Sequence, residues 1–308
     1  MKISIIGAGN VGSTLAFKIL EEELADVVLV DINGDMAKGK ALDLNDACGV
    51  LGSKKKAVGA GNYSEIRGSE VVVVTAGFAR RPGMTREDLL IKNAGVIKEV
   101  AGKIKENAPQ SIILMVTNPL DVTTYLALKV SGFDKKRVLG MAGVLDSARL
   151  SVIVSDELRR EVSSVESLVL GTHGDSMVPL KNKISAGGRR LDELLEKAKI
   201  DELLEKAAGQ GGRIVSYLKG GSAYYAPAIS VYKMLEAIVN DRGSILPVSA
   251  YLEGEYNLRD VCLGVPARLG KGGIEEIVEV ELTKEEEISL QKAGAVIKAG
   301  IAKVITAD

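Results

Sequence analysis

The chain contains a single histidine, His173, within the string Gly171-Thr172-His173-Gly174-Asp175-Ser176. Histidine is the only side chain whose unperturbed pKa lies in the physiological range, so it is the usual proton shuttle in acid–base catalysis. If this protein uses an imidazole for such chemistry, His173 is the residue that does so. Taken alone, His173 fits a polar loop side chain equally well, and other residues must decide between the two interpretations.

Three further groups of residues could act together with a histidine. Asp146 and Arg149 are three residues apart and would share one face of a helix, although such a pair is more often a surface ion pair. The string 117–119, Thr-Asn-Pro, follows a run of apolar residues, and ligands bind where the strands of an open parallel sheet end. The third group is a set of arginines in a loop broken by proline and glycine: Arg80, Arg81 and Arg86.

A glycine-rich string, Gly7-Ala8-Gly9-Asn10-Val11-Gly12, follows an apolar run and precedes a helical segment. In a strand–turn–helix unit these glycines allow a tight turn, close approach of a pyrophosphate and close packing of helix on strand. Asp31 comes 19 residues after Gly12 and ends the next apolar run, which suits a carboxylate that bonds a ribose 2′-hydroxyl. Because a carboxylate there repels a 2′-phosphate, the sequence predicts dinucleotide binding with NAD favoured over NADP.

The elements that must position these residues change in character halfway along the chain. Continuous apolar runs that alternate with helical segments predict an α/β fold, a Rossmann-type doubly wound parallel sheet. The second half predicts an α+β substrate domain with antiparallel strands. We therefore expect two domains, residues 1–142 and 143–308. The expected strands are 2–6, 27–30, 71–75, 112–116 and 137–140, then 165–170, 245–252, 260–269 and 274–281.

Three helical features are expected in the second half. Residues 211–239 predict one long helix or two abutting ones, with a bend at 220–221. The heptapeptide DELLEKA occurs at 192–198 and again at 201–207, and nine residues of α-helix rotate by about 900°, half a turn out of phase. We therefore expect a break near Lys199 that makes two short helices. Thr283 and Glu286 form a capping-box pattern that opens a terminal helix.

Composition excludes several classes of partner. Forty basic and 41 acidic residues leave a net charge of −1, so neither nucleic acid nor an anionic membrane is expected as a partner. No signal peptide or membrane span is expected. Cys48 and Cys262 lie far apart and lack metal-ligand spacing, which favours buried reduced thiols over a disulfide. These features together predict a cytoplasmic location.

In their order and spacing, the residues quoted above resemble the lactate/malate dehydrogenase superfamily, specifically its tetrameric, lactate-dehydrogenase-like malate dehydrogenases. The resemblance runs from the glycine string to the terminal helix. It implies an oxidoreductase of the tricarboxylic acid cycle that is a homotetramer or homodimer. The apolar faces of 151–158 and 226–239 are the expected contacts between subunits.

The resemblance also implies roles for individual residues. His173 would be the acid/base group, and Asp146 would orient it as the aspartate of a hydrolase triad does. Arg149 would bind the substrate carboxylate, while Arg86, on a loop expected to close, would polarise the reacting carbonyl. Asn118 would hydrogen-bond the substrate. The implied cofactor contacts are Gly7, Ala8, Gly9, Asn10, Val11, Gly12, Asp31, Asn93, Val116, Thr117 and Asn118, and no metal is implied.

Arg80 distinguishes the possible substrates. Lactate enzymes of the superfamily typically carry glutamine at the matching position, and malate enzymes carry arginine. Because a second carboxylate buried under a closed loop requires a cation, Arg80 favours malate and oxaloacetate. Two alternatives stay open: a dehydrogenase for lactate or another 2-hydroxy acid, and a non-catalytic dinucleotide-binding protein. The latter would not need Asp146, Arg149, Arg86 and His173 together.

Overall fold

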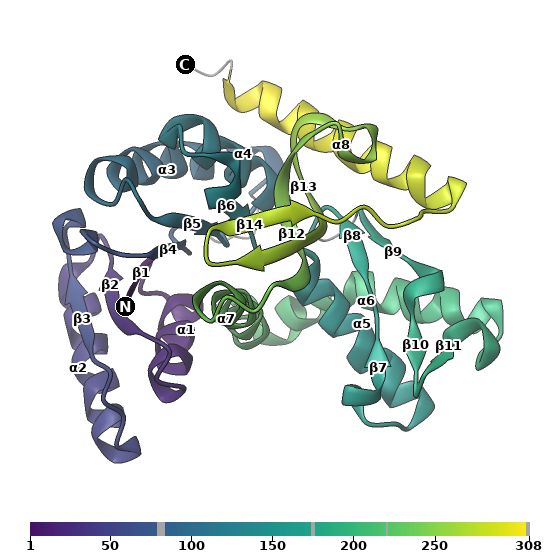
Figure 1. The fold of residues 1–308 in the computed structure, drawn as a ribbon, viewed down its shortest axis with the longest axis horizontal. Coiled ribbons are helices and arrows are strands. Elements are labelled where there is room, and N and C mark those ends of the chain that lie inside the picture. The colour runs from purple at the N-terminus through teal and green to yellow at the C-terminus, as the bar shows by residue number, and fades with distance from the viewer. Residues whose placement is uncertain (79–83, 174–175, 220, 306–308) are drawn as a thin grey trace.

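A computed structural model describes residues 1–78, 84–173, 176–219 and 221–305 (Figure 1). Its first half forms a parallel sheet in the order β3-β2-β1-β4-β5-β6. The strand order reverses between β1 and β4, which is where an open α/β sheet binds its ligand. The strands are β1 (Lys2–Ile6), β2 (Asp26–Val30), β3 (Ala57–Ala60), β4 (Val71–Val74), β5 (Ile112–Met115) and β6 (Val138–Gly140).

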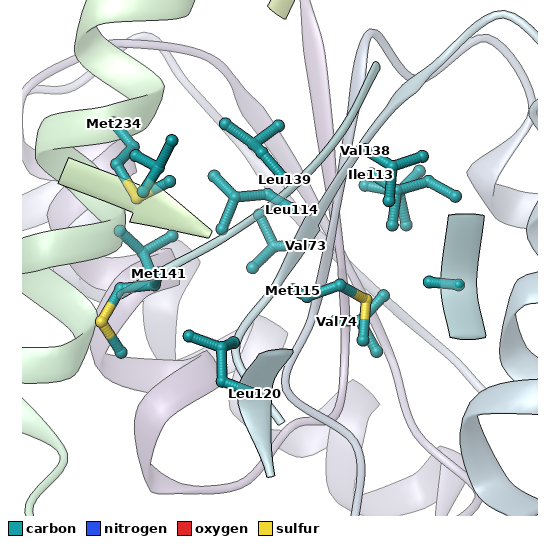
Figure 2. Close-up of a cluster of buried hydrophobic side chains, with 14 of the residues drawn as sticks. Val73, Val74, Ile113, Leu114, Met115, Leu120, Val138, Leu139, Met141 and Met234 are labelled. Carbon is teal, nitrogen blue, oxygen red and sulfur yellow. The ribbon is translucent and has the colours of Figure 1, made fainter. Parts of the chain in front are cut away.

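Helices cover both faces of this sheet, and α3 and α4 lie on the side opposite α1 and α7 (Tyr225–Val239) (Figure 1). The central strands β4 and β5 are buried along their whole length, as their continuous apolar sequence predicts. Figure 2 shows side chains of β4, β5 and β6 packed with Leu120 and with Met234. This apolar interior fixes the strand ends that follow it. The helices of the first half are α1 (Asn10–Glu21), α2 (Gly34–Leu51), α3 (Arg86–Asn107) and α4 (Leu120–Ser131).

The second half continues the same sheet with antiparallel strands. Ser249 of β12 pairs with Gly140 of β6, so that eleven strands of the described chain form one sheet. A second buried cluster lies under α5 (Gly143–Leu158) and α6 (Lys197–Leu218), and a small sheet β11-β10-β7 borders it. The strands here are β7 (Val165–Glu166), β8 (Val169–Gly171), β9 (Met177–Pro179), β10 (Ser185–Ala186), β11 (Arg189–Arg190), β12 (Ser244–Glu253), β13 (Arg259–Gly270) and β14 (Gly273–Ile277). The α/β fold with an antiparallel second half is thus confirmed.

Several local predictions were wrong. The expected strand 165–170 is two strands, β7 and β8, which belong to different sheets. Between these two strands, the Ser167 hydroxyl donates to the Ser147 carbonyl at 2.8 Å. The strand expected at 274–281 ends at Ile277, and β3 was not predicted because Ala and Gly in it carry little strand signal.

The helices of the second half also differ from expectation. They are α5 (Gly143–Leu158), α6 (Lys197–Leu218), α7 (Tyr225–Val239) and α8 (Lys284–Ile305). Residues 211–239 are divided between two helices, which is one of the two expected alternatives: α6 ends at Leu218 and α7 begins at Tyr225, on either side of the expected bend at 220–221. Only the last two residues of the first DELLEKA copy, 192–198, belong to α6, whereas the second copy is fully helical, with Ile200, Leu203 and Ala207 on the buried face of α6. The expected break near Lys199 between two short α-helices is therefore not observed. Instead, α6 begins at Lys197 and continues through Lys199. Both bonds of the Thr283–Glu286 capping box are present, as predicted.

Short 3-10 helices complete the description, at Tyr63–Ile66, Lys135–Arg137, Val162–Ser164, Lys181–Lys183, Leu191–Glu193 and Glu255–Asn257. Within the described residues, no helix combines the length and apolar character needed to cross a bilayer. Cys48 and Cys262 are both buried and free, which confirms the prediction of reduced thiols.

Candidate active site

The glycine string forms the turn between β1 and α1. Gly7 has a φ of +109°, and a Cβ there would lie 2.6 Å from the Thr75 hydroxyl oxygen. A Cβ on Gly12 would lie 2.0 Å from the Gly7 carbonyl oxygen, so both positions require glycine. At Gly9, by contrast, no atom lies within 4 Å of where a Cβ would be. Open space therefore borders the backbone at the start of α1, whose first residues are Asn10 and Val11.

Asp31 contacts this turn directly. Its Oδ2 accepts the backbone N–H of Ala8 at 2.8 Å, and its Oδ1 accepts that of Asn33 at 2.9 Å. The carboxylate lines a cleft of about 530 Å³ together with Gly9 and Tyr63. The expected turn and its acidic residue thus lie together, at the edge of one cleft.

Lys40 of α2 is a contact that the sequence did not reveal. Its Nζ donates to the Ala8 carbonyl at 2.6 Å and to the Ser13 hydroxyl at 2.9 Å. The Ala8 residue is therefore held from two sides, by Asp31 at its N–H and by Lys40 at its carbonyl. A lysine at the seventh position of a helix gives no sequence signal for such a role.

The ends of β4 and β5 are tied together by Asn93. Its amide nitrogen donates to the Asn118 carbonyl at 2.6 Å, and its amide oxygen accepts the Phe78 N–H at 2.7 Å. Asn93 is completely buried, so it lies behind the strand ends rather than at their surface. Val116 donates its N–H to the Val74 carbonyl, and the Thr117 hydroxyl donates to the Ala76 carbonyl. Asn118 itself is exposed.

His173 and Asp146 form a close pair. Nδ1 of the imidazole lies 2.9 Å from Oδ2 of Asp146, whose side chain is only 3% exposed. With Nδ1 bonded in this way, Nε2 is the ring nitrogen left for a substrate. Asp146 belongs to the first turn of α5, while His173 follows β8. The His173 ring and Asn118 line one cavity of about 510 Å³.

Arg149 lies one helical turn after Asp146 and contacts its other oxygen, Nη1 to Oδ1 at 3.5 Å. Burial lowers the pKa of Arg149, and the charge of Asp146 opposes that shift. The Arg149 Nε is buried and has no hydrogen-bond partner among the described residues. A guanidinium with an unsatisfied buried donor is suited to bind an anion.

Asp121 is a second buried carboxylate near His173 that the sequence analysis missed. It is 2% exposed and accepts the Ser249 hydroxyl at 2.7 Å. The available signal was its position, three residues after Asn118 at the same strand end. Burial raises the pKa of Asp121 to about 6, and hydrogen bonds from Ser249 and from the His173 backbone oppose that increase.

Two expected substrate-binding residues cannot be placed. Arg80 lies outside the described residues, and for Arg86 the structure describes the backbone as the first residue of α3 but not the side chain. Thr85 and Asp88 form a complete capping box at this helix start. Across the described residues, no three His, Cys, Asp or Glu side chains cluster in a way that could hold a metal ion.

Residues 1–140 match the NAD binding domain of the lactate/malate dehydrogenase family, and residues 143–307 match its alpha/beta C-terminal domain. The chain is 48% identical over 297 residues to the malate dehydrogenase of Staphylococcus carnosus, covering 96% of each protein. A solved malate dehydrogenase from Cryptosporidium parvum superposes with a TM-score of 0.97 at 40% identity, covering 99% of each chain. A lactate dehydrogenase from that organism, complexed with lactic acid and nicotinamide adenine dinucleotide, has a TM-score of 0.96 at 36% identity, covering 100% of this chain and 98% of that one.

These matches define an oxidoreductase with an NAD-binding Rossmann domain. The chain belongs to the lactate/malate dehydrogenase family.

Proposed function

We propose that this protein is an NAD-dependent malate dehydrogenase, which interconverts malate and oxaloacetate. The observation that carries the proposal is the buried Asp146 carboxylate bonded to Nδ1 of His173 at the wall of a cavity. That cavity lies at the ends of the parallel strands, where this class of fold binds ligands. The similarity to malate dehydrogenases along almost the whole chain supports the choice of substrate.

The residues around the glycine turn fit a dinucleotide. Open space at Gly9 leaves room for a pyrophosphate at the start of α1, and the Asp31 carboxylate is oriented at the edge of the adjoining cleft. Val116, Thr117 and Asn93, which are linked by hydrogen bonds at the ends of β4 and β5, would contact the cofactor, a role that rests on the sequence pattern. When bound, NAD supplies the hydride acceptor for malate oxidation, and NADH supplies the hydride donor for the reverse direction.

His173 moves the proton. In malate oxidation the neutral imidazole accepts the proton of the C2 hydroxyl at Nε2, and in the reverse direction the protonated ring donates it to the carbonyl oxygen of oxaloacetate. Asp146 fixes the ring through Nδ1 and stabilises the imidazolium that forms. Asn118, on the same cavity wall, hydrogen-bonds the substrate.

The arginines bind the two carboxylates of the substrate. Arg149, with a buried unsatisfied Nε beside Asp146, would hold the carboxylate next to C2 in a bidentate pair. Arg86 would polarise the reacting carbonyl, and Arg80 would neutralise the second carboxylate. The roles of Arg80 and Arg86 rest on the sequence pattern alone.

A lactate dehydrogenase is the second candidate, because a lactate dehydrogenase with a TM-score of 0.96 is among the related structures. The two functions are separated by steady-state NADH oxidation with oxaloacetate and pyruvate compared side by side. We expect kcat/KM for oxaloacetate to exceed that for pyruvate by orders of magnitude. A preference for pyruvate would favour the second candidate, and turnover of neither substrate would contradict both.

The His173→Asn variant tests the site itself. We expect turnover to disappear while NADH binding, measured by fluorescence, remains. Loss of turnover and NADH binding together would contradict a purely catalytic role for His173.

Several further properties belong to the proposal. NAD is preferred over NADP, and the catalytic half, 143–308, is a domain distinct from the cofactor-binding half, 1–142. A homotetramer or homodimer is supported by exposed apolar side chains at Val152 of α5 and at Tyr225 and Ile229 of α7. A place in the tricarboxylic acid cycle follows from the proposed substrate. Two free buried thiols support a cytoplasmic location.

A further inference from the structure

Two buried carboxylates, Asp146 and Asp121, lie beside His173. Asp146 holds the imidazole ring at Nδ1, as described above. Asp121, in the first turn of α4, accepts the Ser249 hydroxyl at 2.7 Å and lines the same cavity as His173, whose backbone N–H and ring charge lower the pKa of this carboxyl. Acidic residues of two different helices therefore border the histidine, Asp146 at its ring and Asp121 on the wall of the same cavity.

Within the described part of the chain, Asp121 lacks the cationic side chain that normally accompanies a buried carboxylate. Among the described residues it forms no ion pair with lysine or arginine, although its side chain is buried completely. Burying an ionised carboxylate without a cation is costly, because the group loses its hydration. Among the groups that the structure describes, the positive charge that favours the ionised form of Asp121 is that of protonated His173. Buried titratable groups of this kind are concentrated at functional sites.

The other charged groups around Asp121 do not replace that partner. On α5, the Asp146 charge opposes ionisation of Asp121, and Arg149 is paired with Asp146. On β13, Cys262 is a buried thiol whose pKa burial and Asp121 both raise. Across the cavity, Glu87 of α3 and Lys303 of α8 form an ion pair with each other at 2.8 Å.

We propose that Asp121 is a positioning residue for His173, which fixes the backbone of the histidine and, together with Asp146, stabilises its protonated ring. This inference rests on the proposed function, in which His173 carries the proton. Because two interacting groups stabilise each other reciprocally, ionised Asp121 favours the imidazolium as much as the imidazolium favours ionised Asp121. A pKa of about 6 for Asp121 means that this support is present at neutral pH and fades in acid.

The single histidine makes the test direct. In tag-free protein labelled with 13C at histidine Cε1, the NMR titration contains one imidazole signal, that of His173. Asp121→Asn removes the charge but keeps an oxygen that can accept from Ser249 and from the His173 N–H. We expect the midpoint of the His173 titration to move to lower pH by about one unit in this variant.

Two further variants complete the experiment. Ser249→Ala removes one bond to ionised Asp121 and should move the midpoint in the same direction by a smaller amount, which keeps the test decisive if Asp121→Asn does not fold. Asp260→Asn is the matched control, because this carboxylate bonds Tyr125, Tyr251 and Lys129 and not the histidine. It should leave the midpoint unchanged.

Enzyme kinetics provide the second measurement. In Asp121→Asn the pH profiles of kcat/KM for oxaloacetate and for malate should both shift to lower pH by the amount seen in the titration, with NADH affinity unchanged. An unmoved midpoint in both Asp121→Asn and Ser249→Ala would overturn the inference. The NMR titration needs no turnover, so wild-type protein inactive on oxaloacetate would refute the proposed function without affecting the test of Asp121.

Discussion

The Asp146 carboxylate joins His173 to Arg149. Its Oδ2 lies 2.9 Å from Nδ1 of the imidazole, and its Oδ1 lies 3.5 Å from Nη1 of the guanidinium. The two basic side chains come from different elements, the turn after β8 and the first half of α5. One buried acidic residue therefore sets the distance between the group proposed to transfer the proton and the group proposed to bind the substrate carboxylate.

Asp146→Asn tests whether Asp146 acts through its negative charge as well as by orienting the His173 ring. The amide can still contact the ring, but it cannot stabilise the imidazolium and can select the wrong tautomer, so we expect kcat/KM to fall by roughly 10²–10⁴-fold. NADH affinity should not change. Asp156→Asn, an exposed position on the same helix, is the control and should keep full activity. Retained activity in Asp146→Asn would contradict the role of the pair.

Arg80→Gln tests the choice of substrate. Without this cation the second carboxylate of oxaloacetate would be buried unpaired, whereas pyruvate has no such group. We expect the ratio of kcat/KM for oxaloacetate over pyruvate to fall by at least about tenfold, which corresponds to the loss of one charge-assisted contact. Arg81→Gln, one residue further on, should leave the ratio unchanged. If the two variants behave alike, Arg80 does not determine specificity.

Much of the fold could be predicted because burial on both faces leaves a plain sequence pattern. The valine-rich and isoleucine-rich runs of β4 and β5 end within one residue of the predicted positions. The strand β3 could not be found, because its two alanines and one glycine pack as an edge strand without a β-branched run. The start of α6 depends on which side chains the second core buries, and that is a property of the folded protein.

The residues of the candidate site also differ in how far they could be predicted from the sequence. The glycine turn, Asp31 and the pair Asp146–Arg149 follow fixed local spacings, so the sequence predicted them. Asp121 acquires its role from Ser249, which is 128 residues away, and Lys40 acquires its role from Ala8, which is 32 residues away. Only the packed tertiary structure brings such partners together.

Asp31→Ser should narrow the preference for NAD over NADP. The variant loses the carboxylate that repels a 2′-phosphate and bonds a 2′-hydroxyl, and a serine can donate to either. We expect the ratio of kcat/KM for NADH over NADPH to fall by about tenfold or more. Lys40→Met is the matched control: it releases the Ala8 carbonyl from the other side and should weaken both cofactors by the same factor. An unchanged ratio in Asp31→Ser would exclude Asp31 from the ribose site.

Asp121 should also make the stability of the protein depend on pH. Burial raises the pKa of this carboxyl to about 6 in the folded protein, above its usual value near 3.9. The folded state therefore holds the proton more tightly than the unfolded state. The stability that this provides is complete below pH 4 and is lost as the pH rises through 6.

Asp121→Asn lacks the titrating group, so its free energy of unfolding relative to wild type should increase by roughly 1 kcal/mol between pH 5 and pH 7.5. Urea unfolding followed by circular dichroism at these two pH values measures the difference. If the free energy of unfolding changes by the same amount in wild type and in Asp121→Asn between these pH values, Asp121 has a similar proton affinity in the folded and unfolded states.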